Sequence, residues 1–192
     1  MIPQSRLILA SRSPQRKAIL EQLGIPFEVR PQGVEELITG AAPEALVLEN
    51  ARRKARGAAA GGDDTVLGVD TEVLIEDELL GKARSKEEAR GFLERLSGRS
   101  HTVLGGLVLI ADGAERTGVA ATQVTFRTLS RELVDWFLAT GEWRERAGAY
   151  AIQGRGAALV ERIEGDYWNV VGLPGPLLLD LAPGLLVHSA DK

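Results

Sequence analysis

The feature that constrains the fold most is a short apolar run at residues 7–9. It is followed closely by the start of a capped amphipathic helix. Ser13 is a natural N-cap for that helix, and Pro14 is a natural first helical residue. The junction leaves backbone N–H groups at a helix N-terminus, where the helix dipole favours an anion. Ser11 and Arg16 lie at the same junction and suit phosphate oxygens. A capped helix with solvated basic residues explains this pattern too, so the local sequence leaves both interpretations open.

Helix and strand patterns alternate along the rest of the chain, without an internal repeat or a low-complexity linker. We expect further strands at residues 27–31, 65–69, 102–110, 118–127 and 157–163, and a hairpin over 72–80. We expect further helices over 43–59, from Ser85 to Gly98, after Ser130 and over 177–181, with Gly61-Gly62 ending the first and a Ser85–Glu88 capping box opening the second. This alternation predicts an α/β fold, a mixed β-sheet with flanking helices, in a single domain spanning residues 1–192.

Composition narrows the chemistry that the chain can perform. The formal net charge of −4 over 192 residues argues against a nucleic-acid binder. There is no cysteine, which excludes disulfides and thiolate chemistry, and the histidines are His101 and His188, too few for a histidine-rich zinc site. Neither a signal peptide nor an apolar run long enough to span a membrane is evident, so we expect a cytoplasmic protein.

Four charged residues are candidates for chemistry. Asp70 directly follows the expected buried strand at 65–69, and ligands of open α/β sheets gather at the carboxyl ends of strands. Lys54 and Lys82 could each supply a positive charge for phosphate, and Glu36, one of two adjacent glutamates, could hold Mg²⁺. Each has an ordinary alternative: a polar residue that ends a strand, solvated lysines, or an exposed acidic loop.

Two glycine-rich segments, residues 147–156 and 165–174, also carry polar and aromatic side chains. The first contains Gln153, whose carboxamide offers one acceptor and two donors, as the edge of a nucleobase requires. A pair of tight turns with packed aromatic residues also accounts for both segments.

Together these pieces resemble one family, the Maf proteins, which are nucleoside triphosphate pyrophosphatases. No single piece is diagnostic, whereas the set in this order is highly specific and covers nearly the whole chain. The matching landmarks are Leu9 to Arg16, Glu35-Glu36, Lys54-Ala55, Gly68 to Thr71, Gly81-Lys82, Leu96 to Gly98, His101 to Val103, Ala147 to Gly154 and Tyr167 to Pro174.

The resemblance implies an enzyme that hydrolyses a nucleoside triphosphate to the monophosphate and pyrophosphate. It further implies a Maf/ITPase-like fold with two lobes around a central cleft, a divalent metal cation (Mg²⁺ or Mn²⁺), and often a homodimer. Thr71 and Gln153 match the branch of the family that acts on dTTP and UTP, which points to pyrimidine nucleotides, canonical or modified. Gln15 departs from that branch, which often carries Arg at this position, so one cation near the substrate is missing.

The resemblance also assigns roles to the candidate residues. Asp70 is the general base or metal-assisted base, with Lys54 and Lys82 as further catalytic residues. Glu36 and Asp70 are the expected metal ligands. The expected substrate-binding residues are Ser11, Gln15, Arg16, Thr71 and Gln153.

Three alternatives remain open at this point: a pyrophosphatase of the family's 7-methyl-GTP branch, a cell-division regulator that acts through a protein partner, and a nucleotide-binding sensor without turnover. The regulator predicts no dependence of activity on Asp70. The presence of Asp70, Lys54 and Lys82 argues against the sensor. We expect a nucleoside triphosphate substrate and neither a nucleic-acid nor a membrane partner.

Overall fold

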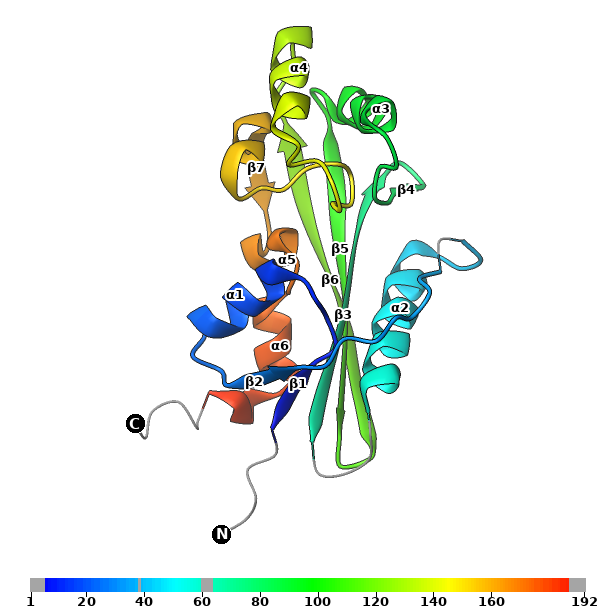
Figure 1. The fold of residues 1–192 in the computed structure, drawn as a ribbon, viewed down its shortest axis with the longest axis vertical. Coiled ribbons are helices and arrows are strands. Elements are labelled where there is room, and N and C mark those ends of the chain that lie inside the picture. The colour runs from blue at the N-terminus through cyan, green and yellow to red at the C-terminus, as the bar shows by residue number, and fades with distance from the viewer. Residues whose placement is uncertain (1–5, 38, 60–63, 187–192) are drawn as a thin grey trace.

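The computed structural model describes residues 6–37, 39–59 and 64–186, which are built around a mixed β-sheet (Figure 1). His188 lies outside these ranges. Within them, no helix is long and apolar enough to cross a membrane.

The elements follow the predicted alternation of strands and helices. The strands are β1 (Leu7–Leu9), β2 (Phe27–Val29), β3 (Thr65–Ile75), β4 (Glu78–Leu80), β5 (Ser100–Ala111), β6 (Ala114–Phe126) and β7 (Val160–Glu164). The helices are α1 (Pro14–Gln22), α2 (Pro43–Ala58), α3 (Lys86–Leu96), α4 (Arg131–Thr140), α5 (Tyr167–Val171) and α6 (Gly175–Leu181), with the 3₁₀ helices η1 (Gly154–Leu159) and η2 (Pro183–Leu185). The strand order is β2-β1-β3-β5-β6-β7, with β4 paired to β3. β1 is parallel to β2 and β3, and the other pairings are antiparallel, which confirms the predicted mixed α/β sheet.

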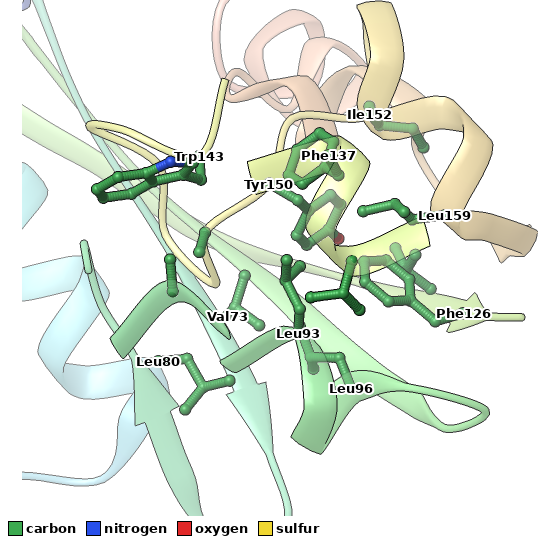
Figure 2. Close-up of a cluster of buried hydrophobic side chains, with 14 of the residues drawn as sticks. Val73, Leu80, Leu93, Leu96, Phe126, Phe137, Trp143, Tyr150, Ile152 and Leu159 are labelled. Atoms are coloured by element: carbon green, nitrogen blue, oxygen red, sulfur yellow. The ribbon is translucent and has the colours of Figure 1, made fainter. Parts of the chain in front are cut away.

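Two lobes share the long strands β3, β5 and β6 (Figure 1). In the first lobe, α1 and α6 bury apolar residues on one face of the sheet and α2 buries alanines on the other. In the second lobe, α3, α4 and the segment before β7 enclose a separate core around Leu93, Phe126 and Phe137 (Figure 2). Each lobe thus has its own apolar core, and the strands that run through both hold the lobes together.

Glycines in the sheet let α2 approach it closely. A Cβ added at Gly68 would lie 2.1 Å from the carbonyl oxygen of Ala51, and one at Gly106 would lie 2.5 Å from that of Val47. Neither position has room for a side chain, so glycine is required by the packing. The close approach brings the polar residues of α2 against the strand that carries Asp70.

The prediction that a strand ends before Asp70 is wrong. β3 continues through this residue, pairing Asp70 with Gly106 and Glu72 with Leu104 of β5. Because β5 supplies backbone partners over this whole length, polar side chains do not stop the strand. Alternation along a strand instead turns Asp70 and Glu72 toward the same face. The hairpin expected over 72–80 is the far end of this same strand together with β4.

Two segments differ from the predicted secondary structure. Residues 157–159 belong to η1 rather than to a strand, because the chain turns tightly there: a Cβ at Gly156 would lie 1.8 Å from the carbonyl oxygen of Ala151. The glycine-rich segment 165–174, where no helix was expected, contains α5, which is capped by the Asp166 carboxylate accepting from the Trp168 N–H.

Other differences concern the ends of elements. β6 begins at Ala114, directly after the turn that follows β5, and not at residue 118 as predicted. β2 is shorter than the predicted strand, and α6 begins at residue 175 instead of 177. α2 ends before Gly61-Gly62, which lie outside the described residues. Ser85 caps α3 by accepting from the Glu88 N–H, as predicted. The Glu88 carboxylate, however, accepts from the Arg84 N–H instead of the Ser85 N–H, so the expected capping box is shifted by one residue.

Candidate active site

The predicted site residues surround one cavity of about 580 Å³ between the two lobes. They come from the β1–α1 turn, the loop after β2, α2, β3, the residue after Gly81 and the loop before η1. The structure brings together the whole predicted set: Ser11, Gln15, Arg16, Glu36, Lys54, Asp70, Thr71, Lys82 and Gln153. A cavity of this size is typical of small-molecule sites.

Asp70 is held in place through both carboxylate oxygens. Only 3% of the residue is exposed. Lys54 Nζ lies 2.6 Å from Asp70 Oδ1 and 2.5 Å from Glu36 Oε1, so one ammonium group compensates two carboxylates. The Asn50 side-chain amide donates to Asp70 Oδ2 at 3.3 Å. A carboxylate fixed in this way still has lone pairs with which to accept a proton or contact a cation.

Arg16 ties the β1–α1 turn to β3 and to the end of α5. Its guanidinium donates to Ser11 Oγ at 2.9 Å, to Thr71 Oγ1 at 3.1 Å and to the Gly172 carbonyl at 2.8 Å. Thr71 Oγ1 also donates to the Gly172 carbonyl at 3.3 Å. Burial lowers the pKa of Arg16, while Asp70 and other nearby carboxylates act in the opposite direction. Arg16 thus supplies positive charge and also shapes the wall of the cavity.

The first turn of α1 confirms the predicted cap. Ser13 Oγ accepts from the Arg16 N–H, and Pro14 is the first helical residue. Gln15 is buried, and its Oε1 accepts from Ser13 Oγ at 3.0 Å. This chain therefore has at position 15 a neutral side chain that hydrogen-bonds within the turn.

Glu36 and Glu72 have pKa values shifted in opposite directions. Burial alone would raise the pKa of Glu36, but Lys54, Lys82 and other cations outweigh burial and hold it below its usual value. Burial, reinforced by Asp70 and Glu36, raises the pKa of Glu72 to about 8. Its Oε2 is buried and has no hydrogen-bond partner among the described residues. Burial beside two other carboxylates thus disfavours the charged form of Glu72.

Lys82 and Gln153 make weaker contacts with the rest of the protein than Lys54 and Arg16 do. Lys82 Nζ is 3.8 Å from Glu36 and 4.0 Å from Glu145, and half of the side chain is exposed. The Gln153 carboxamide makes no hydrogen bond to any described residue. It lines the main cavity and also a neighbouring cavity of about 340 Å³. Both side chains can therefore contact a ligand without breaking strong internal bonds.

Asn50 and Glu72 are two residues of the site that our sequence analysis missed. Asn50 lies four residues before Lys54, which is the spacing that puts two side chains on one face of a helix. Glu72 lies two residues after Asp70, the spacing of one face of a strand. The second signal was hidden by the wrong expectation that the strand ended at Asp70.

The carboxylates of the cavity are suitable oxygen donors for a hard divalent cation. Among the described residues, however, no three acidic, histidine or cysteine side chains converge to form a metal site by themselves. Lys54 lies between Asp70 and Glu36. The residues present thus fit a cation that takes one or two protein carboxylates and completes its coordination with oxygens of a bound ligand.

The geometry as a whole suits hydrolysis of an anionic substrate. A fixed carboxylate faces a cavity that also contains cations and a helix N-terminus, both of which stabilise negative charge. The uncommitted carboxamide of Gln153 can hydrogen-bond a neutral polar group of the same ligand.

Comparison with known proteins agrees with this chemistry. The family model for Maf-like proteins matches residues 6–183. The dTTP/UTP pyrophosphatase of Pyrococcus abyssi is 42% identical over 176 residues, covering 91% of this chain and 94% of that protein. The dTTP/UTP pyrophosphatase of Symbiobacterium thermophilum is 48% identical over 171 residues, covering 88% of each. Among solved structures, a HAM1 protein from Coxiella burnetii matches with a TM-score of 0.49 and 21% identity, covering 67% of this chain and 76% of that chain.

Proposed function

This chain belongs to the Maf family, and from that membership and its cavity we propose that it is an enzyme hydrolysing nucleoside triphosphates to the monophosphate and pyrophosphate. The relatives named dTTP/UTP pyrophosphatase support dTTP and UTP as substrates, and the proposal extends to modified pyrimidine nucleotides. The observation that carries the proposal is Asp70, fixed by Lys54 and Asn50 at the wall of a cavity lined with cations.

In the proposed reaction, Asp70 accepts a proton from a water molecule that attacks the α-phosphorus. The new bond forms between the water oxygen and the α-phosphorus, and the bond from the α-phosphorus to the bridging oxygen of pyrophosphate breaks. General-base catalysis of this kind contributes about 10²–10⁴-fold to a rate. Lys54 and Asn50 orient the carboxylate, so Asp70 needs little rearrangement before it acts.

Several cations hold the triphosphate in the proposed complex. Lys54 and Lys82 stabilise charge on the transferring phosphoryl group and its leaving pyrophosphate. Arg16, Ser11 and the N-terminus of α1 bind phosphate oxygens from the side of the β1–α1 turn. Because Arg16 and Ser11 already hydrogen-bond each other at 2.9 Å, this wall is organised before the substrate arrives.

A divalent cation, Mg²⁺ or Mn²⁺, is part of the proposal, with Asp70 and Glu36 as its protein ligands. When bound, it would neutralise charge on the phosphate oxygens. The oxygen donors support this assignment, and two protein ligands would leave coordination positions for oxygens of the triphosphate and for water.

Gln153 is the proposed reader of the pyrimidine, because its carboxamide lines the cavity and is free to pair with the edge of a base. Thr71 is proposed to assist, although its hydroxyl must first give up its bond to the Gly172 carbonyl. Gln15 also lines the cavity and is proposed to modify the base preference of the site.

A homodimer and a cytoplasmic location, where nucleoside triphosphates are made and used, complete the proposal. The family resemblance supports the dimer. The mass of the protein in solution, measured by light scattering during size-exclusion chromatography, tests the dimer. We expect twice the mass of one chain, and the mass of a single chain would reject the dimer.

The activity is tested by identifying the products from UTP, dTTP, CTP, ATP, GTP and 7-methyl-GTP with Mg²⁺ or Mn²⁺. We expect monophosphate and pyrophosphate, with the highest kcat/KM for UTP and dTTP. Diphosphate and inorganic phosphate as products would reject the proposed bond cleavage. A preference for 7-methyl-GTP would reject the branch, and no turnover of any nucleotide would favour a regulator or sensor.

A further inference from the structure

Arg146 is a half-buried cation whose guanidinium lies without a hydrogen-bonding partner among the described residues. Its guanidinium forms neither a hydrogen bond nor an ion pair with any residue in the part of the chain that the structure describes. Burial lowers the pKa of Arg146, and Glu142 and Glu145 act in the opposite direction without outweighing burial. A partly desolvated guanidinium without a partner is unfavourable in the free protein. It therefore indicates a position where an anion binds.

The position of Arg146 identifies which ligand it faces. Arg146 lines the main cavity and also the neighbouring cavity that it shares with Gln153. It immediately precedes Ala147, whose backbone forms an isolated antiparallel bridge with Lys82. Two cations from distant parts of the chain, Arg146 and Lys82, thus lie on adjoining backbone at the rim of the main cavity.

The segment that carries Arg146 is held in an unusual conformation. Glu145 and Ala149 have positive φ angles of 57° and 58°, which residues other than glycine rarely adopt. The Gly148 N–H fixes the segment by donating to the Leu80 carbonyl at 2.7 Å. Strained backbone of this kind clusters at ligand-binding sites, because the surrounding structure must impose it. Arg146 is thus presented by a fixed segment rather than by a loose loop.

We propose that Arg146 is a further substrate-binding residue, which grips a phosphate group of the nucleotide together with Lys82. The proposal rests on the proposed function of the site. An anionic phosphate compensates a desolvated guanidinium better than a neutral base carbonyl does, and the guanidinium can donate two parallel hydrogen bonds to phosphate oxygens. Arg146 also adds positive charge to a cavity whose lining includes the neutral side chain of Gln15.

Direct binding of inorganic pyrophosphate, measured by calorimetry at constant Mg²⁺, tests this proposal without turnover. Arg146→Ala should raise the Kd for pyrophosphate about tenfold or more, as expected for loss of charge-assisted hydrogen bonds. Arg146→Lys keeps a charge but loses the paired donors, and should raise the Kd about threefold. Uridine, which has no phosphate, should bind each variant as it binds the wild type.

Arg162→Ala is the matched control, because it removes an exposed arginine of β7, paired with Glu164 at 2.8 Å and outside both cavities. It should bind pyrophosphate with unchanged affinity. The conservative lysine variant keeps the test valid where Arg146→Ala does not fold.

An unchanged Kd for pyrophosphate in the Arg146 variants overturns the inference. So does weaker binding of uridine with unchanged pyrophosphate binding, which would mean that Arg146 contacts the nucleoside. Failure of the proposed function looks different: the wild type would bind pyrophosphate in an Arg146-dependent way and yet release none from UTP.

Discussion

Lys54 contributes to the stability of the site and, in the proposed function, to catalysis. Its ammonium group is mostly buried and lies within 2.6 Å of two carboxylates. Lys54→Ala should therefore lower the free energy of unfolding by about 3 kcal/mol, because it leaves Asp70 and Glu36 without their shared partner. Lys82 is half exposed, with contacts no shorter than 3.8 Å, so Lys82→Ala should change that free energy by less than about 0.5 kcal/mol.

Both lysine variants should nevertheless hydrolyse UTP more slowly by at least about tenfold, since each loses charge near the phosphates. Urea unfolding gives the stability, and pyrophosphate release per folded molecule gives the activity. Full activity in folded Lys82→Ala protein would mean that this lysine is only a solvated surface residue.

Gln153 should control the choice of base. Gln153→Ala removes the carboxamide that we propose pairs with the pyrimidine, and should lower kcat/KM for UTP about tenfold while leaving the slow reaction with GTP nearly unchanged. Gln123→Ala on β6, an exposed glutamine that donates to Thr102, is the control and should change neither rate. Equal losses for UTP and GTP in Gln153→Ala would exclude a role in base choice.

The role of a single residue could be predicted from the sequence where it depends only on neighbouring residues. Ser13 and Pro14 define a helix start by short-range chemistry, and the structure confirms the cap. Asn50 was predictable in principle from its helical spacing to Lys54. Arg146 was not, because its lack of a partner depends on which distant segments lie around it.

At the scale of elements, the buried His101–Tyr150 pair joins β5 to the loop that carries Gln153. His101 Nε2 and Tyr150 Oη are 2.8 Å apart, and Figure 2 shows Tyr150 within the apolar core of the second lobe. Burial lowers the pKa of His101 to about 4. We therefore expect the second lobe to lose stability in acid.

The sign of this pH dependence follows from proton binding. Between pH 6.5 and 4 the unfolded chain binds a proton at His101 and the folded chain does not, so stability falls as the pH decreases through this range. From pH 6.5 to 5, urea unfolding should show the wild type losing about 1–2 kcal/mol more than His101→Gln, which lacks the titrating group. Parallel losses in the two proteins would exclude His101 as the cause.

Element boundaries were less predictable than element types. We predicted that the strand ends at Asp70 because the sequence becomes polar there. In the structure, pairing with β5 overrides that local preference and the strand continues. α5 and η1 lie in glycine-rich segments whose conformation is set by close backbone approaches, such as that of Gly156 to Ala151. Such tertiary constraints leave no periodic pattern in the sequence.

At the scale of the whole molecule, the cleft exists because two apolar cores share the strands β3, β5 and β6. We propose that the chain is one domain for this reason. Differential scanning calorimetry should show a single transition whose calorimetric and van't Hoff enthalpies agree. Two separate transitions would mean that the lobes unfold independently.

The α/β class and its mixed sheet followed from the alternation of helix and strand patterns along the chain. The meeting of the β1–α1 turn, α2, β3 and the segment at 145–153 around one cavity did not follow from periodicity. It came only from the ordered landmarks of the family, because the spatial proximity of distant segments depends on the complete topology.

The central claim is that Asp70 activates water for attack on the α-phosphorus of a pyrimidine nucleoside triphosphate. Hydrolysis of UTP in water enriched in the heavy oxygen isotope, followed by mass spectrometry of both products, tests it most directly. The account predicts label in UMP and none in pyrophosphate, with a rate lower by about 10²–10⁴-fold in folded Asp70→Asn protein. Label in pyrophosphate, or an Asp70→Asn variant that turns over as fast as the wild type, would contradict it.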